Sequence, residues 1–303
     1  MTRRNLITAM LLLLTTAIIA DEYTDPLTGV VYIYEKGSGV AKVKEGVYHA
    51  WDSRTRSASQ EKEIVVLDSF KVDGCEYAVN EIGNYAFYYS DAVTIKIPQT
   101  VKRIGDYVFQ GNYNLRAASL PDSLKSLGVF AFSRCDQLTT ISLPDQMTVI
   151  PRGTFHTCRS LCEITLPESL VEIGEMSFIC CSNLHEIVIP KQVTTIGMGA
   201  FEECGIATII SQIEEPGDID INAFGDETYE NATLYVPTGS KSKYEATTGW
   251  SRFKTIIEGS PTAIQSIRQR NFEEPAYDLQ GHRLNGSRQK GIYIHDGKKK
   301  LAK

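Results

Sequence analysis

A phenylalanine recurs along this chain at a nearly constant spacing. Its seven positions are separated once by 22 residues and then five times by 23 residues: Phe87, Phe109, Phe132, Phe155, Phe178, Phe201 and Phe224. A proline keeps the same period at Pro98, Pro121, Pro144, Pro167 and Pro190. A fixed period of this length is typical of one supersecondary unit stacked on copies of itself. It favours a scaffold that presents a surface over a globular catalytic core.

Each repeat contains two short extended stretches. Ile141 and Leu143 alternate with Ser142, which is the period of a short strand. Pro144 ends that strand because it has no N–H to donate to a ladder. A second extended stretch follows, and the periodic Phe155 comes after it. The sequence therefore predicts a β-rich solenoid, a right-handed array of about seven coils of about 23 residues with parallel sheets and little helix.

The ends of such an array need caps. Extended stretches at 30–34 and 40–43 flank a turn that contains two glycines, which predicts a hairpin at the front. At the back we expect a last strand, a short helix and an aromatic plug. The chain then divides into a signal peptide (1–20), an N-terminal β capping region (21–76), the solenoid with its C-terminal cap (77–257), a linker (258–275) and a small C-terminal β unit (276–303).

The first twenty residues have the pattern of a secretory signal peptide. Arg3 and Arg4 precede an apolar run from Leu6 to Ile19, and Ala20 is a small residue at a cleavage point. This run is short for a spanning helix, and no later apolar run is long enough to cross a bilayer. We therefore expect a protein that is secreted or held at the cell surface.

Charge is distributed unevenly along the chain. Residues 277–303 hold seven basic and two acidic residues, a net charge of +5, whereas residues 21–276 carry 22 basic and 35 acidic residues, a net charge of −13. An acidic body argues against a nucleic-acid partner, whose phosphates demand a basic face. Within the array, the outward positions change from basic at the front to acidic at the back.

The repeat resembles a known family. The pattern Leu-x-x-Ile-x-Leu-Pro-x-x-Leu-x-x-Ile-Gly-x-x-x-Phe-x-x-Cys holds in register over five units. It is similar to the BspA-type, or treponemal-type, leucine-rich repeat. The closing stretches 234–244 and 249–253 are also similar to the way those arrays end. The resemblance implies a bacterial surface protein, with adhesion and host-matrix binding known for some members.

The C-terminal stretch carries a second resemblance. Residues 277–284, 290–294 and 297–303 form short β-prone segments with a basic end. They are similar to the C-terminal sorting domain of the type IX secretion system. That resemblance implies an outer-membrane export machinery as a partner. The alternative is a terminal β-hairpin that merely packs on the array.

Four cysteines stand three residues after the periodic phenylalanine, at Cys135, Cys158, Cys181 and Cys204. One possibility is a soft-metal site, and a second is disulfides between neighbouring coils. A third is a column of small buried thiols that donate weakly to backbone carbonyls. Ser90 and Asn112 hold the equivalent positions in the first two coils, which favours the third possibility. No histidine shares the column, so we expect no metal.

The sequence holds none of the usual catalytic motifs. It lacks a Gly-x-Ser-x-Gly elbow, a His-Glu-x-x-His pair and a glycine-rich phosphate loop. Paired acids such as Glu202-Glu203 are most simply explained as solvated turns. We therefore expect a protein that is not an enzyme and that needs no cofactor.

The outward positions of the first strand in each repeat are small and mostly uncharged, so a partner chain could lie close to them. We expect binding to centre on Thr140, Ser142, Glu163, Thr165 and Glu186. The expected partners are proteins, either of the host extracellular matrix or of other cell surfaces. The alternative is a structural or display array of the cell surface with no specific ligand. Clustered substitutions should weaken a binding column and leave a display array unaffected.

Overall fold

The computed structural model describes residues 20–46 and 63–259, together with the backbone of 291–295 and 298–302. The chain forms two compact units, 1–258 and 259–303. The predicted signal peptide and linker lie almost wholly outside the described residues. Among the residues that are described, no helix is long and apolar enough to span a membrane.

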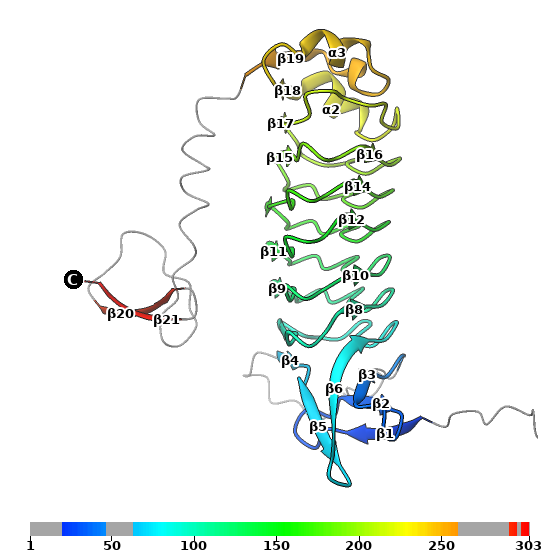
Figure 1. Ribbon diagram of the computed structural model, residues 1–303. Coiled ribbons are helices and arrows are strands. Elements are labelled where there is room, and N and C mark those ends of the chain that lie inside the picture. The colour runs from blue at the N-terminus through cyan, green and yellow to red at the C-terminus, as the bar shows by residue number, and fades with distance from the viewer. Residues whose placement is uncertain (1–19, 47–62, 260–290, 296–297, 303) are drawn as a thin grey trace, which may run out of the picture. The chain divides into compact units, whose positions relative to one another are not determined.

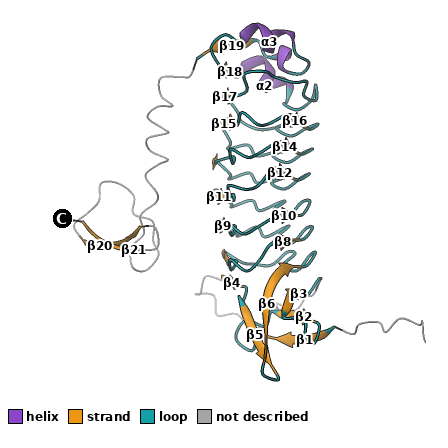
Figure 2. Ribbon diagram, viewed as in Figure 1, coloured by secondary structure: helices purple, strands orange, loops and turns teal. Residues whose placement is uncertain are grey.

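The first unit is a β-solenoid with parallel sheets, as predicted (Figure 1). It has about eight turns rather than seven. The additional turn is closed by the C-terminal cap. Because the cap lacks the periodic phenylalanine, the 23-residue pattern did not predict this turn. Figure 2 shows that strands and turns make up the coils and that the helices of the described residues lie at the C-terminal end of the array.

One side of every coil is a short strand, called here a main strand. Five of them pair in parallel as one sheet: β4 (Glu63–Val65), β7 (Thr94–Lys96), β9 (Ala117–Ser119), β11 (Thr140–Ser142) and β13 (Glu163–Ile164). Four more form a second parallel sheet: β15 (Glu186–Ile189), β17 (Thr208–Ser211), β18 (Thr233–Val236) and β19 (Thr255–Glu258). In the described part of the chain no ladder joins β13 to β15, so the main strands form two sheets rather than one.

The second extended stretch of each coil is a two-residue strand, called here a second strand. β8 (Arg103–Ile104) and β10 (Ser126–Leu127) extend a sheet that also contains the longer β6 (Cys75–Ile82). β12 (Val149–Ile150), β14 (Glu172–Ile173) and β16 (Thr195–Ile196) form a separate parallel sheet. In each of these five second strands, β8, β10, β12, β14 and β16, the first residue is exposed and the second is buried.

The N-terminal cap is antiparallel. β1 (Asp21–Thr24), β2 (Val31–Tyr34) and β3 (Val40–Val43) form a meander, and β5 (Ser69–Val72) pairs with β6. The β2–β3 pairing confirms the predicted hairpin. β3 then pairs in parallel with β6, so the cap shares one sheet with the first coils. This shared sheet covers the front end of the solenoid core.

The C-terminal cap contains more structure than the sequence predicted. Besides the expected strand β18 and helix α3 (Lys241–Ala246), it contains helix α2 (Asp226–Asn231), a 3₁₀ turn η3 (Trp250–Arg252) and strand β19. The expected aromatic plug is present: the Trp250 ring is fully buried and lies against Phe224, the last periodic phenylalanine. The Trp250 Nε1 donates to the carbonyl of Gly217 at 3.1 Å, which satisfies its polar atom.

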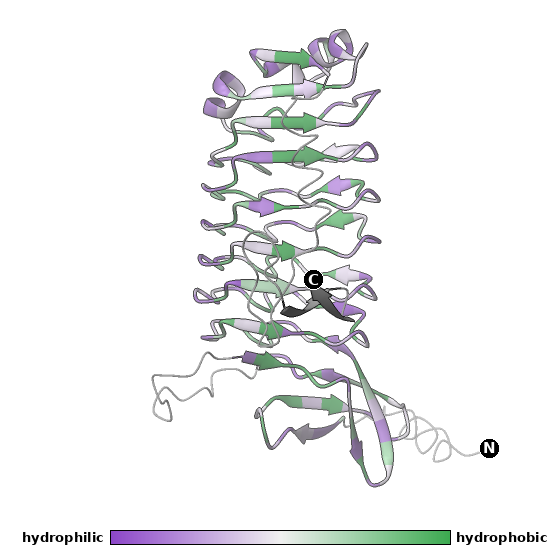
Figure 3. Ribbon diagram, turned by 90° about the vertical axis from the view of Figure 1, so that its left-hand side faces the viewer, coloured by the Kyte–Doolittle hydropathy of each residue, from purple (hydrophilic) through white to green (hydrophobic). Residues whose placement is uncertain are grey.

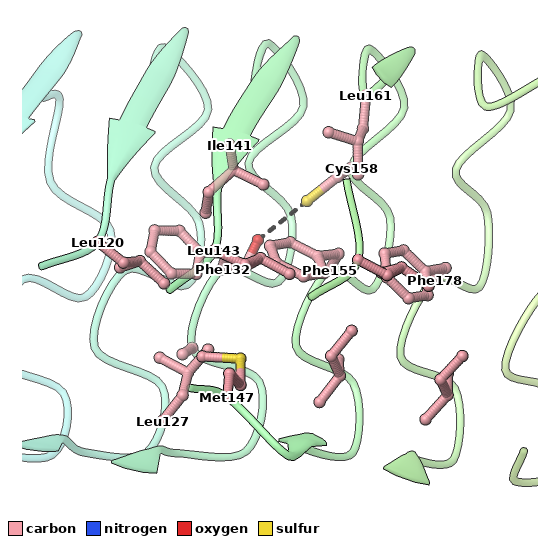
Figure 4. Close-up of a cluster of buried hydrophobic side chains, with 14 of the residues drawn as sticks. Leu120, Leu127, Phe132, Ile141, Leu143, Met147, Phe155, Cys158, Leu161 and Phe178 are labelled. Carbon is pink, nitrogen blue, oxygen red and sulfur yellow. Dashed lines mark hydrogen bonds between the residues drawn. The ribbon is translucent and has the colours of Figure 1, made fainter. Parts of the chain in front are cut away.

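The seven periodic phenylalanines form one continuous stack inside the coils, and Figure 4 shows the part of it with Phe132, Phe155 and Phe178. Neighbouring ring centroids are 5.0–5.9 Å apart, and no ring is more than 2% exposed. Ile141 of β11, Leu143 just after this strand and Leu161 of the next turn are buried beside the stack. A single coil would expose both faces of its ring, so each coil depends on its neighbours for burial.

The second unit contains a hairpin of β20 (Gly291–His295) and β21 (Lys298–Ala302), paired antiparallel over five residues each. It falls inside the predicted small C-terminal β unit. Residues 276–290 of that predicted unit are outside the described residues.

Among the buried hydroxyls without a hydrogen-bond partner in the described residues is that of Ser177. Ser177 precedes the periodic Phe178, is fully buried, and its Oγ makes no hydrogen bond. The equivalent position in other coils is most often alanine. An unsatisfied buried polar group costs about 1–3 kcal/mol. Ser177→Ala should therefore raise the free energy of unfolding by about 1 kcal/mol, measured by urea denaturation.

The matched control for this prediction is Thr154→Ala one coil earlier. The Thr154 Oγ1 donates to the carbonyl of Pro151 at 2.8 Å, so this substitution should destabilise the protein. Equal destabilisation by both substitutions would contradict the assignment of Ser177 as unsatisfied.

Candidate binding surface

Four of the five residues predicted to bind a partner lie together on the outer side of the main strands. Thr140 in β11 is paired with Glu163 of β13, and Ser142 is paired with Ser119 of β9. Ser142, Glu163 and Thr165 are exposed, and Thr140 is half-buried. The outer side of these strands, called here the main strand face, is therefore a regular surface of hydroxyl, methyl and carboxylate groups over a continuous parallel sheet.

The fifth residue, Glu186, belongs to a different sheet. It begins β15, whose only ladder in the described residues is to β17. Glu186 is half-buried, and burial raises the pKa of its carboxyl group. The sequence period placed Glu186 one coil beyond Glu163 but gave no indication that the hydrogen-bonded sheet is interrupted between them.

The sequence analysis missed an apolar column at the C-terminal end of the main strand face. In register across four strands lie Val188, Ile210, Tyr235 and Ile257. Ile210 is buried but lies outside the core cluster, and Ile257 is 43% exposed. Figure 3 shows the stretches of high hydropathy on these last strands. The signal was present in the sequence, because the outward residue of each successive strand is apolar from Val188 onward.

A shallow hollow lies at the other end of the main strand face. It has a volume of about 500 Å³ and is lined mainly by the ends of β4, β7 and β9 and the prolines Pro98 and Pro121 that follow the last two. Ser119 lines this hollow and is paired with Ser142, so the hollow adjoins the cluster of Thr140, Ser142, Glu163 and Thr165. The main strand face therefore has apolar surface at both ends and small polar side chains between them.

The cysteine column is structural, as the third possibility predicted. Each thiol donates to the carbonyl of the periodic phenylalanine one coil earlier, at Sγ–O distances of 3.0–3.3 Å: Cys135 to Phe109, Cys158 to Phe132, Cys181 to Phe155 and Cys204 to Phe178. The side-chain amide of Asn112 makes the same bond to Phe87 at 2.8 Å. All seven cysteines are free, and the described residues contain no cluster that could hold a metal ion.

Burial suppresses the reactivity of this column. It raises the pKa of the Cys158 thiol to about 12 and also raises the pKa of Cys135 and Cys181. The nucleophile is the thiolate, so these groups are inert near neutral pH. By contrast, Cys75 and Cys162 are exposed.

In sequence and in structure, this array is similar to leucine-rich repeat proteins. The family model described as "BspA type Leucine rich repeat region" matches residues 80–231 in six copies. A leucine-rich repeat protein of T. pallidum is 22% identical with a TM-score of 0.51, over 83% of this chain and 97% of that chain. One from Eubacterium ventriosum is 19% identical with a TM-score of 0.54, over 68% of this chain and 49% of that chain. No curated protein matched the sequence.

Alkylation of the native protein tests the roles assigned to the cysteines. Iodoacetamide at pH 8 should modify Cys75 and Cys162, while Cys135, Cys158 and Cys181 should react only after unfolding. Peptide mass spectrometry gives the extent at each site. Equal native reactivity of Cys158 and Cys162, or a mass two hydrogens lower per cysteine pair in the untreated protein, would contradict the assignment.

Proposed function

The chain belongs to the BspA-type leucine-rich repeat family, and from this premise we propose that it is an exported cell-surface protein that binds other proteins through its main strand face. The observation that carries the proposal is the flat column of small outward side chains around Thr140, Ser142, Glu163 and Thr165. Small side chains allow a partner backbone to approach closely, and the hydroxyl and carboxylate groups supply hydrogen-bond partners. A partner can also bury the apolar surface at each end of the main strand face.

The expected affinity of one array is modest. A face with few large anchors buries little apolar area, and association must first offset the lost freedom of both partners. A dissociation constant around micromolar is therefore expected for a single array. Many copies on one cell would raise the effective affinity through avidity. If a partner pairs with the carboxylates of Glu163 and Glu186, added salt should weaken its binding.

Surface plasmon resonance against extracellular-matrix proteins tests the binding proposal. The double substitution Thr140→Arg/Thr165→Arg places two long charged side chains on the face and should weaken binding about tenfold or more. The matched control is Gln146→Arg/Gln192→Arg, two exposed residues in the turns that follow main strands. It adds the same charge away from the face and should leave binding unchanged.

The outcome separates two functions. If both double variants fold and bind like the wild type, the partner uses another surface. If neither matrix nor cell-surface proteins bind the wild type at all, the array is a structural or display element with no specific ligand.

The proposal includes export. Residues 1–20 have the pattern of a signal peptide, and residues 276–303 resemble a sorting domain read by an outer-membrane secretion machinery. Deletion of 277–303 should leave a folded protein that accumulates in the periplasm, as followed by cell fractionation and surface proteolysis. Unchanged surface display after this deletion would contradict the role of the tail.

A further inference from the structure

A second surface of the array is marked by its exposed apolar side chains. It consists of the second strands and of the turns that carry the periodic phenylalanine, and it is called here the turn side. Of the ten large apolar side chains that are exposed in the described residues, seven lie on it: Tyr85, Tyr89, Tyr113, Val149, Val171, Met198 and Ile221. Such a concentration on one side of a molecule marks an interaction surface.

The front of the turn side carries aromatic residues whose backbone is in the unfavourable left-handed conformation. Tyr85, Tyr107 and Phe130 stand two residues before the periodic phenylalanine and have φ of 57°, 57° and 54°. Their rings stack at centroid distances of 4.9 and 5.3 Å. Glycine adopts this left-handed conformation freely, and it occupies the same position at Gly153 and Gly199. Three successive coils therefore keep large aromatic rings, exposed at Tyr85 and half-buried at Tyr107 and Phe130, where glycine would adopt this conformation without strain. This points to a function for the rings.

Charge is segregated along the same axis. Residues 82–159 contain eight basic and five acidic residues, a net charge of +3, while residues 160–225 contain one basic and eleven acidic residues, a net charge of −10. On the turn side the exposed basic residues lie at the front, and the exposed acidic residues lie at the back: Arg103, Lys125, Arg134 and Arg152, then Glu172, Glu175, Glu202 and Glu203.

We propose that the protein pairs with a second copy of itself through the turn side, with the two arrays antiparallel. The two-fold axis runs along the strand direction, between the coil of Phe155 and the coil of Phe178. A two-fold interface uses the same patch on both copies, so the patch must complement itself. A patch that is basic at one end and acidic at the other meets this condition only when the arrays run in opposite directions.

The equal spacing of the coils fixes which residues meet. The third coil of one copy, which contains Phe132, faces the sixth coil of the other, which contains Phe201. Arg134 and Glu203 each stand two residues after the phenylalanine of their coil, so they face each other. Arg152 faces Glu175, both three residues before it. In the isolated protein these two side chains approach each other at 3.6 Å, Nε to Oε2, so they can exchange partners. Phe130 lies against the exposed Met198 of the facing coil and gives the contact an apolar centre.

A second copy fits these observations better than an unrelated acidic protein. An acidic partner would explain the aromatic and basic front of the turn side but not the exposed Met198 and Ile221 in its acidic back half. The antiparallel pair buries both halves at once. The pairing is independent of the proposed function, because it leaves the main strand face of each copy uncovered. It would also double the number of binding faces in one particle.

Sedimentation equilibrium of the purified protein at low and high salt tests the pairing. We expect a monomer–dimer equilibrium that weakens as salt screens the charges. Arg134→Glu and Glu203→Arg should each raise the dimer dissociation constant about tenfold or more, because each sets like charges against each other at two places in the dimer. The combined variant Arg134→Glu/Glu203→Arg restores opposite charges and should recover dimerisation.

The controls are Lys191→Glu and Glu168→Arg, which make the same changes in charge at exposed positions on the opposite turns of the coils. They should leave dimerisation unchanged, and thermal unfolding of every variant should verify that it is folded. A wild type that stays monomeric at all accessible concentrations overturns the proposal. So do single reversals without effect and a combined variant that does not recover.

Discussion

The structure depends on one constraint, which is that no coil can bury its own core. Each periodic phenylalanine from Phe109 to Phe201 is covered on both faces only because another ring of the stack lies 5.0–5.9 Å away on either side. The strands of each coil likewise find hydrogen-bond partners mainly in the neighbouring coils. The period is therefore kept to within one residue, because a coil of very different length would displace the ring, both strands and the turn together. The two caps cover the end coils, which have a neighbouring coil on one side only. The front cap is an antiparallel meander, and the back cap is an aromatic cluster.

The polar interior follows the same constraint. The carbonyl of each periodic phenylalanine from Phe87 to Phe178 is buried and accepts a hydrogen bond from the side chain of the next coil. Asn112 supplies that donor near the front, and cysteines supply it in the following coils. A thiol is small enough to fill the turn and, at its raised pKa, keeps the proton that it donates. The cysteine column is thus explained by backbone hydrogen bonding, which needs neither metal nor disulfide.

The sequence was most informative where a feature repeats. The phenylalanine and proline periods predicted the solenoid, the strand positions and the cysteine column, because the same physical requirement recurs in every coil. It was less informative where coils differ. The interruption between β13 and β15 separates Glu186 from Glu163, and helix α2 falls after the period has ended. The left-handed conformation of Tyr85 and Phe130 could not be predicted from these residues, which rarely adopt it. Comparison with Gly153 and Gly199 in the same column is the signal that would have revealed it.

The central claim is that the array is held together coil by coil, with the 23-residue period as its unit. Deletion of residues 149–171 removes one full period and joins Thr148 to Glu172, its successor in register. The matched deletion of residues 149–159 removes about half a period. Thermal unfolding followed by circular dichroism should show a cooperative transition after the full-period deletion and loss of that transition after the half-period deletion. If the two deletions have the same effect, the 23-residue coil is not the stacking unit of the array.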